Sequence, residues 1–480
     1  MPDVRTTHQP SEKDPAGQPW TILVLLAIAQ FMVILDVTVV NVALPSIGTD
    51  LGFAPEDLQW VVTAYVLFTG GLLLLGGRAA DMLGRRRVLL AGLTVFTLAS
   101  LASGLADSPG MLIASRAVQG FGAAMLLPAA LSTVTATYTG SQRTTALSIW
   151  GAIAAGGAVV GMVVGGMLTS WLSWEWIFFI NVPIGLVAIP LAVQLIAPVP
   201  GTGGLRQLDA LGASTFVAGL VALVYGIEGT STHGWGSSRT LVLFAAGAAL
   251  LAAFAAIERG ASRALIPPAT WRVRSLVSGV GMMLGATGIL VGVLFLSSLY
   301  VQGTLGWSAL EAGFAFLPLT LAIIPVTHLA PHALTALGTK RVLSAGLLLM
   351  AAGAGLLALA PDRPTYATDL LPGFVVMGVG LGFTFVTIQV TAMSEVGERT
   401  AGLASGLVTT GHEIGAALGV AVFSAVAAGT GSGALAGLGS ASGYGDGLTV
   451  AGLVAAGMAA LAVATVPSIR PASAAQASIH

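Results

Sequence analysis

Long apolar stretches alternate with short polar segments along almost the whole chain. A helix needs about 20 apolar residues to cross a hydrocarbon layer about 30 Å thick, and fourteen of the stretches are about that long. We therefore predict an all-α membrane protein with fourteen transmembrane helices. Their approximate ranges are 21–44, 58–77, 88–107, 111–134, 144–170, 176–197, 210–229, 240–257, 275–301, 309–330, 341–360, 368–392, 401–428 and 448–467.

The composition agrees with this pattern. Of the 480 residues, 55% are hydrophobic and 8% are charged, whereas about 25% of the residues of a soluble domain are charged. So little polar surface could not cover a soluble core of this size. The net charge of -1 gives no indication of a nucleic-acid partner. The absence of cysteine excludes disulfides, thiolate chemistry and cysteine-bound metals.

Lys and Arg residues orient the predicted spans. Cytoplasmic loops of membrane proteins carry an excess of these residues, and with the N-terminus inside, 16 of the 19 fall on the cytoplasmic side. Arg239 and Arg363 fall outside, and Arg116 lies within a span. We predict a multi-pass protein of the bacterial cytoplasmic membrane with both termini in the cytoplasm, residues 1–19 forming a disordered tail and residues 469–480 a second tail.

An internal repeat indicates the architecture. The polar segment at residues 76–90 recurs in weaker form at residues 330–349, at an offset of 254 residues. The same offset aligns glycines of two spans, namely Gly157, Gly161 and Gly165 with Gly411, Gly415 and Gly419. Such repeats are typical of transporters built from two similar halves. We predict two six-helix halves, residues 20–197 and 275–468, with a linker and two inserted helices in residues 198–274.

Several motifs resemble those of one family. Gly77–Arg87 fits the pattern G-x-x-x-D-x-x-G-R-R/K-R/K, which lies between spans 2 and 3 in the major facilitator superfamily. Leu35–Pro45, LDVTVVNVALP, is similar to the span 1 signature of its fourteen-span drug:proton antiporter branch. Arg116–Ala123 is similar to the arginine motif of span 4, and Gly151–Gly166 resembles the antiporter signature of span 5. The resemblance covers nearly the whole chain outside the tails.

This resemblance implies a transporter rather than an enzyme. In such a protein, two halves rock about a site near the bilayer midplane, and proton exchange drives export of a drug, an antibiotic or another small amphiphile. No cofactor is expected, and the chain lacks the GxxxxGK[ST] loop of an ATP-driven pump. Since fold does not fix direction, a proton-coupled importer of a small organic solute is the alternative. The expected partners are the substrate, protons and the lipid bilayer, with a monomer as the working unit.

Asp36 is the first candidate for proton coupling. A charge near the centre of a bilayer costs about 2.5 to 3.5 kcal/mol on insertion scales, so a charged residue at this depth is expected to have a functional or structural role. Asp36 lies deep in the first span with Asn41 beyond it, and both can face an aqueous cavity. The carboxylate is either a site for protons or substrate cations, or a hydrogen-bonding group that only holds helices together.

Arg116 and Glu413 are the other candidates for proton coupling. The resemblance implies that Arg116 takes part in proton transfer or sets the pKa of a carboxylate. An arginine does not give up its own proton, so we favour the second role, with a structural ion pair as the alternative. Gln119, at i+3, is expected to face the cavity with Arg116. His412 is a weaker cavity candidate beside Glu413, because adjacent helical residues point about 100° apart. No acid or histidine follows His412 at i+4, and no metal site is expected.

Two further groups of residues have expected structural roles. In the resembled family, the segment after span 2 holds the cytoplasmic side of the transporter closed through contacts of its Asp and Arg residues with facing helices. The residues that match this latch are Gly77, Arg78, Asp81, Gly84, Arg85 and Arg86. Glycine permits the tight turns expected at its first and last glycines. The two aligned glycine series should let neighbouring helices approach closely. Glu228 and Glu311, at span ends, are expected to be solvated.

Overall fold

The computed structural model describes residues 20–54, 57–199, 201, 203, 208–261, 264–361, 363–396, 400–429 and 441–466. The two tails predicted for residues 1–19 and 469–480 lie outside the described residues. Within the described ranges the regular elements are all helical, with no β-strand among them. The prediction of an all-α protein is therefore confirmed.

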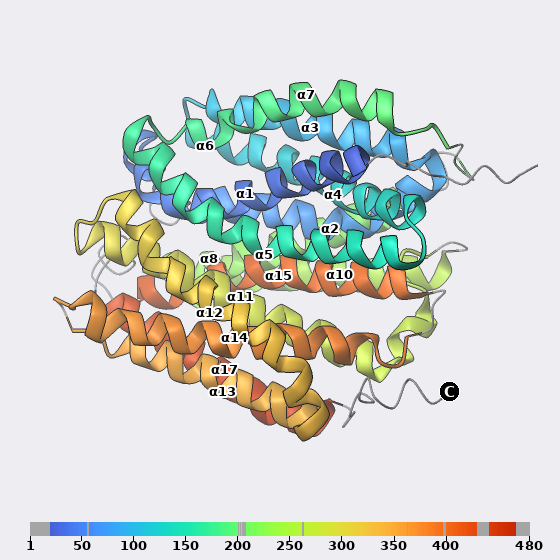
Figure 1. Ribbon diagram of the computed structural model, residues 1–480. Helices are drawn as coiled ribbons and strands as arrows, with labels where there is room; N and C mark the ends of the chain where they lie inside the picture. Colours follow the sequence, from blue (N-terminus) through green and yellow to red (C-terminus); the bar gives the residue numbers. More distant parts are fainter. Residues whose placement is uncertain are drawn as a thin grey trace, which may run out of the picture.

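The helices run side by side in two groups (Figure 1). The first group, called the N-terminal half, comprises α1 (Trp20–Asp50), α2 (Trp60–Leu83), α3 (Arg85–Gly104), α4 (Pro109–Thr137), α5 (Gly140–Trp171), α6 (Trp176–Phe179) and α7 (Asn181–Leu195). The second group, called the C-terminal half, comprises α11 (Arg274–Gly303), α12 (Ala309–Leu337), α13 (Thr339–Ala358), η3 (Tyr366–Leu370), α14 (Leu371–Met393), α15 (Ala401–Gly429) and α17 (Ala441–Thr465). Between them in the chain lie α8 (Ala210–Glu228), α9 (Thr230–His233), α10 (Ser238–Gly260) and η2 (Pro268–Arg272).

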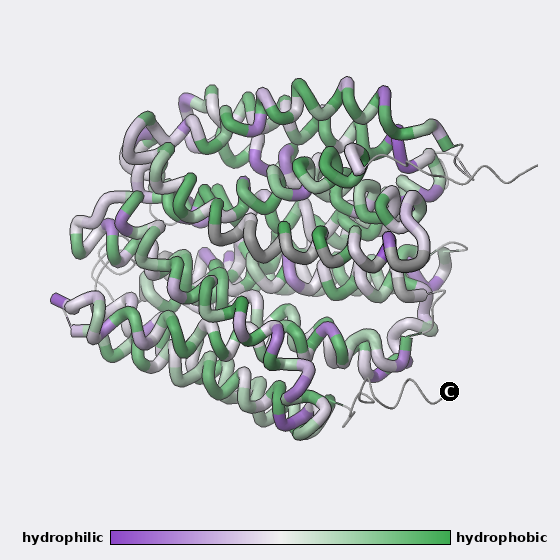
Figure 2. Tube along the Cα trace, in the orientation of Figure 1, coloured by the Kyte–Doolittle hydropathy of each residue, from purple (hydrophilic) through white to green (hydrophobic). Residues whose placement is uncertain are grey.

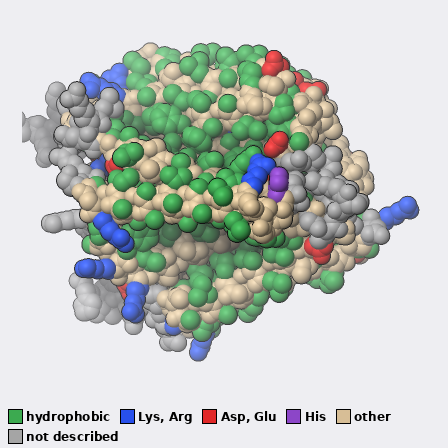
Figure 3. All heavy atoms as spheres, turned by 180° about the vertical axis from the view of Figure 1, so that it is seen from behind, with side chains coloured by type: hydrophobic (Ala, Val, Ile, Leu, Met, Phe, Trp, Pro, Cys, Tyr) green, Lys and Arg blue, Asp and Glu red, His purple; other side chains and the backbone are tan. Residues whose placement is uncertain are grey.

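Length and hydropathy make these helices suited to a membrane. Among the described residues, thirteen helical segments are long and apolar enough to cross one. The remaining long helix, α5, has 32 residues, of which Val160–Trp171 is described as a shorter apolar stretch. Hydrophobic positions dominate the helices in Figure 2. In Figure 3, Lys and Arg side chains gather mainly at one end and acidic side chains at the other, with a hydrophobic band between.

The internal repeat is visible in the backbone. Helix α2 ends at Leu83 and α12 ends at Leu337, which are separated by the 254-residue offset. Gly84 and Gly338 follow with φ of 96° and 79°, a region that residues with a Cβ rarely adopt. Each glycine turns the chain directly into the next helix, so the tight turn predicted at Gly84 is confirmed. We call the end of the molecule that carries these turns the basic end.

The prediction of a loop that begins at Gly77 is wrong. Gly77, Arg78 and Asp81 all lie within α2, and the turn consists of Gly84 alone. A Cβ added to Gly77 would lie 3.6 Å from the Cβ of Pro128 on α4. This is an ordinary van der Waals distance, so neither a turn nor close packing requires glycine at this position. Of the six latch residues, Gly77, Arg78 and Asp81 lie in the last turns of α2, Gly84 forms the turn, and Arg85 and Arg86 begin α3.

The aligned glycine series bring helices together in both halves. A Cβ at Gly161 would lie 2.9 Å from the Cβ of Thr38 on α1, and one at Gly165 would lie 2.8 Å from the Cα of Val39. In the C-terminal half, a Cβ at Gly419 would lie 2.0 Å from the carbonyl oxygen of Gly288 on α11. Each series packs against the first long helix of its own half, so these contacts hold a half together.

Helix α8 packs against α2 and α15, which come from different halves. The indole Nε1 of Trp60 on α2 donates to Glu228 Oε2 at 2.5 Å, and only 6% of Glu228 is exposed. The expectation that Glu228 is solvated is therefore wrong, because a neighbouring helix covers it. Glu311 is exposed as expected and accepts from the Ser308 backbone N–H at 2.7 Å in a capping box.

Candidate functional site

A buried polar cluster surrounds Asp36 in the middle of α1. Arg116 Nη1 donates to Asp36 Oδ2 at 2.5 Å. Gln119 Nε2 and Asn181 Nδ2 donate to Asp36 Oδ1 at 2.8 and 3.0 Å. All four residues are at most 1% exposed. Both carboxylate oxygens are therefore satisfied by side chains from α4 and α7, far from α1 in sequence.

Arg116 is held in place from several sides. Its Nε donates to the carbonyl oxygen of Val61 at 3.0 Å, and its Nη1 also donates to Gln119 Oε1 at 2.7 Å. The guanidinium carbon lies 4.2 Å from the centroid of the Tyr65 ring, within the range of a cation–π contact. A charge removed from water needs such compensation, and these contacts supply it to the guanidinium from α1, α2 and α4.

Two members of this cluster were not identified from the sequence. Asn181 contacts Asp36 directly and also donates to Ser100 Oγ on α3 at 3.0 Å. Ser100 in turn donates to the carbonyl oxygen of Phe178 at 3.0 Å. An amide within an apolar stretch was the available signal for Asn181, but Asn is uncharged, so its position did not stand out as the charges did.

Asn41 and Glu413 lie outside the cluster. Asn41 Nδ2 donates to the Val37 carbonyl oxygen of its own helix at 3.0 Å. Glu413 is 13% exposed and lies 3.6 Å from His412 Nδ1; a Cβ added to Gly70 on α2 would lie 2.4 Å from its Cβ. Glu413 therefore sits where α15 meets α2.

The two predicted proton carriers lie in separate places. Tyr65 packs on the Arg116 side, with its ring centroid 4.2 Å from the guanidinium carbon. The described hydrogen bonds join Asp36 to Arg116, Gln119 and Asn181 rather than to Glu413. Asp36 and Glu413 thus form two separate acidic positions, one inside the N-terminal half and one between the halves. His412 is 41% exposed and outside the cluster.

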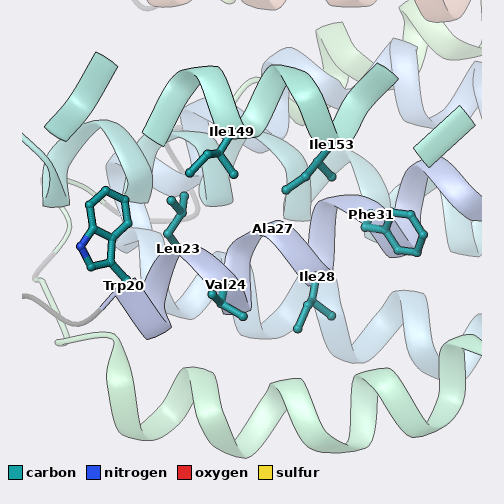
Figure 4. A pocket seen from close by; sticks show the side chains of 8 residues that line it. All are labelled: Trp20, Leu23, Val24, Ala27, Ile28, Phe31, Ile149 and Ile153. Carbon is teal, nitrogen blue, oxygen red and sulfur yellow. The ribbon is translucent and has the colours of Figure 1, made fainter. Parts of the chain in front are cut away.

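An apolar groove with a volume of about 370 Å³ lies between α1 and α5 (Figure 4). All of its lining residues are hydrophobic: Trp20, Leu23, Val24, Ala27, Ile28, Phe31, Ile149 and Ile153. Phe31 precedes Asp36 by five residues, about 7.5 Å along a helix. Five residues also turn an α-helix by about 500°, so Phe31 and Asp36 point about 140° apart, and the groove and the charged cluster lie on different faces of α1.

The arrangement gives no indication of a metal centre. Within the described ranges, no three or more His, Cys, Asp or Glu side chains are grouped so that they could hold a metal ion. What the buried cluster presents is a carboxylate and a guanidinium in direct contact, with two amide side chains on the carboxylate.

The fold and site define a class of protein, a multi-pass helical transporter of the cell membrane. The sequence matches the Major Facilitator Superfamily over residues 26–420, and the chain belongs to this family. It is 41% identical to a puromycin resistance protein of Streptomyces alboniger, over 86% of this chain and 83% of the relative. It is 40% identical to the cephamycin export protein CmcT of Amycolatopsis lactamdurans, over 93% and 92%.

A solved structure supports the same fold. A point mutant of the nucleoside transporter NupG aligns with a TM-score of 0.65, and the alignment covers 92% of this chain and 99% of that one. Its sequence is 13% identical, so the similarity concerns the fold alone. The sequence prediction of the family is confirmed.

Proposed function

We propose that this chain is an efflux transporter that exports antibiotics or other small amphiphilic molecules in exchange for protons. The observation that carries the proposal is the buried Asp36–Arg116 pair within membrane-spanning helices. Ionisable groups in such a place are costly and usually serve transport. The two relatives of about 40% identity, named for puromycin resistance and cephamycin export, support the direction and the substrate class.

Proton exchange follows from the geometry of the pair. A proton on Asp36 would remove the negative charge that holds the guanidinium of Arg116, and the ion pair at 2.5 Å would lose its attraction. Arg116 would then be a buried charge without a counter-charge, which disfavours this arrangement of α1 and α4. Protonation and helix arrangement are thereby coupled, with Gln119 and Asn181 positioning the carboxylate. Glu413, between the halves, is the second proposed carrier.

The substrate class is proposed from α1. The apolar groove suits the hydrophobic part of an amphiphile. Asp36 is fully buried, so it would interact with a polar or cationic part only in a conformation in which its cluster opens. Asn41 and His412, which lie away from the cluster, remain proposed contributors to the substrate cavity. Puromycin, which the name of one relative suggests, is a suitable first probe.

The orientation and organisation complete the proposal. The positive-inside rule places the basic end in the cytoplasm, and with it both termini. We infer fourteen transmembrane helices, namely the thirteen candidate spans and α5, arranged as two six-helix halves with α8 and α10 inserted. A monomer in the lipid bilayer contains both halves and is the proposed working unit, without nucleic acid or cofactor.

Transport in vesicles tests the proposed function. In everted membrane vesicles with an acidified lumen, puromycin should accumulate inside only when the protein is present, because protons leaving the lumen drive the export direction. A protonophore should abolish the accumulation. Vesicles from cells lacking the protein give the background. Accumulation in right-side-out vesicles down an inward proton gradient would instead support the proton-coupled importer.

The residues around Gly84 are proposed to latch the cytoplasmic side. The Gly203 N–H donates to the Met82 carbonyl oxygen at 3.1 Å, so the linker after α7 crosses this turn. Arg86 Nη2 donates to the Val193 carbonyl oxygen at 2.5 Å. The charges of Arg78, Arg85 and exposed Asp81 lie at the same end. The segment is therefore tied to its own half by the backbone, and its charges would contact the facing helices.

Asp81→Asn should slow transport without weakening substrate binding. We expect roughly a fivefold lower rate, the size expected when one exposed charged contact is lost. Rates in the vesicle assay and equilibrium binding of puromycin check this result. Thr335→Val, at the aligned position of the second half, is the matched control and should leave both unchanged. If Asp81→Asn weakened binding in proportion to the rate, Asp81 would stabilise the fold rather than act in the transport cycle.

A further inference from the structure

Two carbonyl groups of α1 bind side chains of the other half. Pro45 lies within α1 and has no N–H, so the carbonyl group of Asn41, four residues earlier, lacks its helical donor. The hydroxyl of Ser298 on α11 donates to this carbonyl oxygen at 2.6 Å. The next carbonyl oxygen, of Val42, accepts from Gln302 Nε2 at 3.0 Å.

The two side chains on α11 form a complete donor set. Gln302 Nε2 also donates to Ser298 Oγ at 2.9 Å, so one amide group supports the hydroxyl and binds α1 itself. Ser298 is fully buried, where a hydrogen bond meets little competition from water. Residues at i and i+4 share one face of a helix, so Ser298 and Gln302 present a single polar face to α1.

The opposite face of α11 is fixed within its own half. Tyr300 stacks on Tyr444 of α17 with ring centroids 4.2 Å apart. Ser297 Oγ lies 3.1 Å from the Tyr444 hydroxyl, within hydrogen-bond distance. Because these contacts stay inside the C-terminal half, α11 moves with that half. The bonds of Ser298 and Gln302 to α1 are then among those that break when the halves separate.

We propose that Ser298, bound to the carbonyl group that Pro45 leaves without a donor, and Gln302, bound to the next carbonyl group, form an outer gate that opens in each transport cycle. The site lies near the C-terminal end of α11, opposite the basic end, and thus at the outer side in the proposed orientation. The inference rests on the proposed transport function, in which the two halves rock about a site near the bilayer midplane. Asn41 follows Asp36 by five residues on the same helix, so a movement of α1 at Asp36 would be transmitted to the gate.

Thiol labelling tests the gate without any substrate. The natural chain has no cysteine, so a single introduced cysteine is the only thiol that can react. Val301 lies between the two gate residues in sequence and is fully buried, and Val301→Cys places the reporter there. Intact cells are treated with a membrane-impermeant maleimide. In this background, Ser298→Ala with Gln302→Leu removes the hydrogen bonds that hold the gate closed. The open state should then be about tenfold more populated, and the labelling rate should rise by the same factor.

Two further variants make the test specific. Ser297→Ala, on the adjacent position but facing α17, is the matched control and should leave labelling unchanged. Pro45→Ala restores an N–H that competes for the Asn41 carbonyl oxygen, so it should increase labelling while Ser298 remains. Labelling of the double variant at the rate of the Ser297→Ala control would overturn the gate. Since labelling needs neither puromycin nor a gradient, a response without any export would contradict the proposed function and leave the gate intact.

Discussion

Asp36→Asn should abolish export driven by a proton gradient while leaving exchange without a gradient. Asparagine keeps the shape of the side chain but cannot take up or release a proton, so a proton gradient can no longer drive export through this position. Gradient-driven export should fall by about 100-fold or more, whereas exchange at equal pH requires no net movement of protons. Puromycin accumulation in everted vesicles with an acid lumen, compared with exchange at equal pH, measures the two activities.

Other acids provide the comparison. Asp446→Asn changes an exposed acid at one end of α17 and should leave export unchanged. Glu413→Gln should have a smaller effect than Asp36→Asn, because Glu413 is partly exposed and makes no hydrogen bond to the described Asp36 cluster. Full gradient-driven export by Asp36→Asn would exclude Asp36 as the carrier. Equal loss in Glu413→Gln would show that the two acids act together.

Arg116→Gln should reduce the amount of folded protein, and a second change should restore it. Removing one partner of a buried ion pair costs about 3 to 5 kcal/mol, because the other charge remains buried without compensation. Asp36 is fully buried, so the single variant should show lower membrane levels and a lower melting temperature in detergent. The double variant Asp36→Asn with Arg116→Gln removes both charges and should recover most of the stability.

The double variant separates folding from transport. It should fold but should not export against a gradient, since neither the proton site nor the fixed charge remains. Arg363→Gln, which changes an exposed arginine, should affect neither property. A double variant as unstable as Arg116→Gln would mean that the packing of the guanidinium against Tyr65, rather than charge pairing, dominates its contribution.

Local patterns in the chain predicted most of the fold. Runs of about 20 apolar residues predict helices that cross a membrane, and the described helices match these runs. Gly84 and Gly338 marked a repeated turn because glycine tolerates positive φ. Asp36 and Arg116 were identified as candidates because charges within apolar runs are costly. The pattern did not predict that α2 continues through Gly77, since a glycine within a helix and a glycine in a turn look the same in a sequence.

The sequence by itself determined that this protein is an all-helical membrane protein with a repeated plan and a few charges inside its spans, because helix length, hydropathy and glycine turns depend on neighbouring residues. Only the tertiary structure decided which groups meet. It paired Asp36 with Arg116, added Asn181 from α7, kept Glu413 apart and covered Glu228 with Trp60. These contacts depend on the rotation and axial position of helices far apart in the chain, which no local pattern specifies.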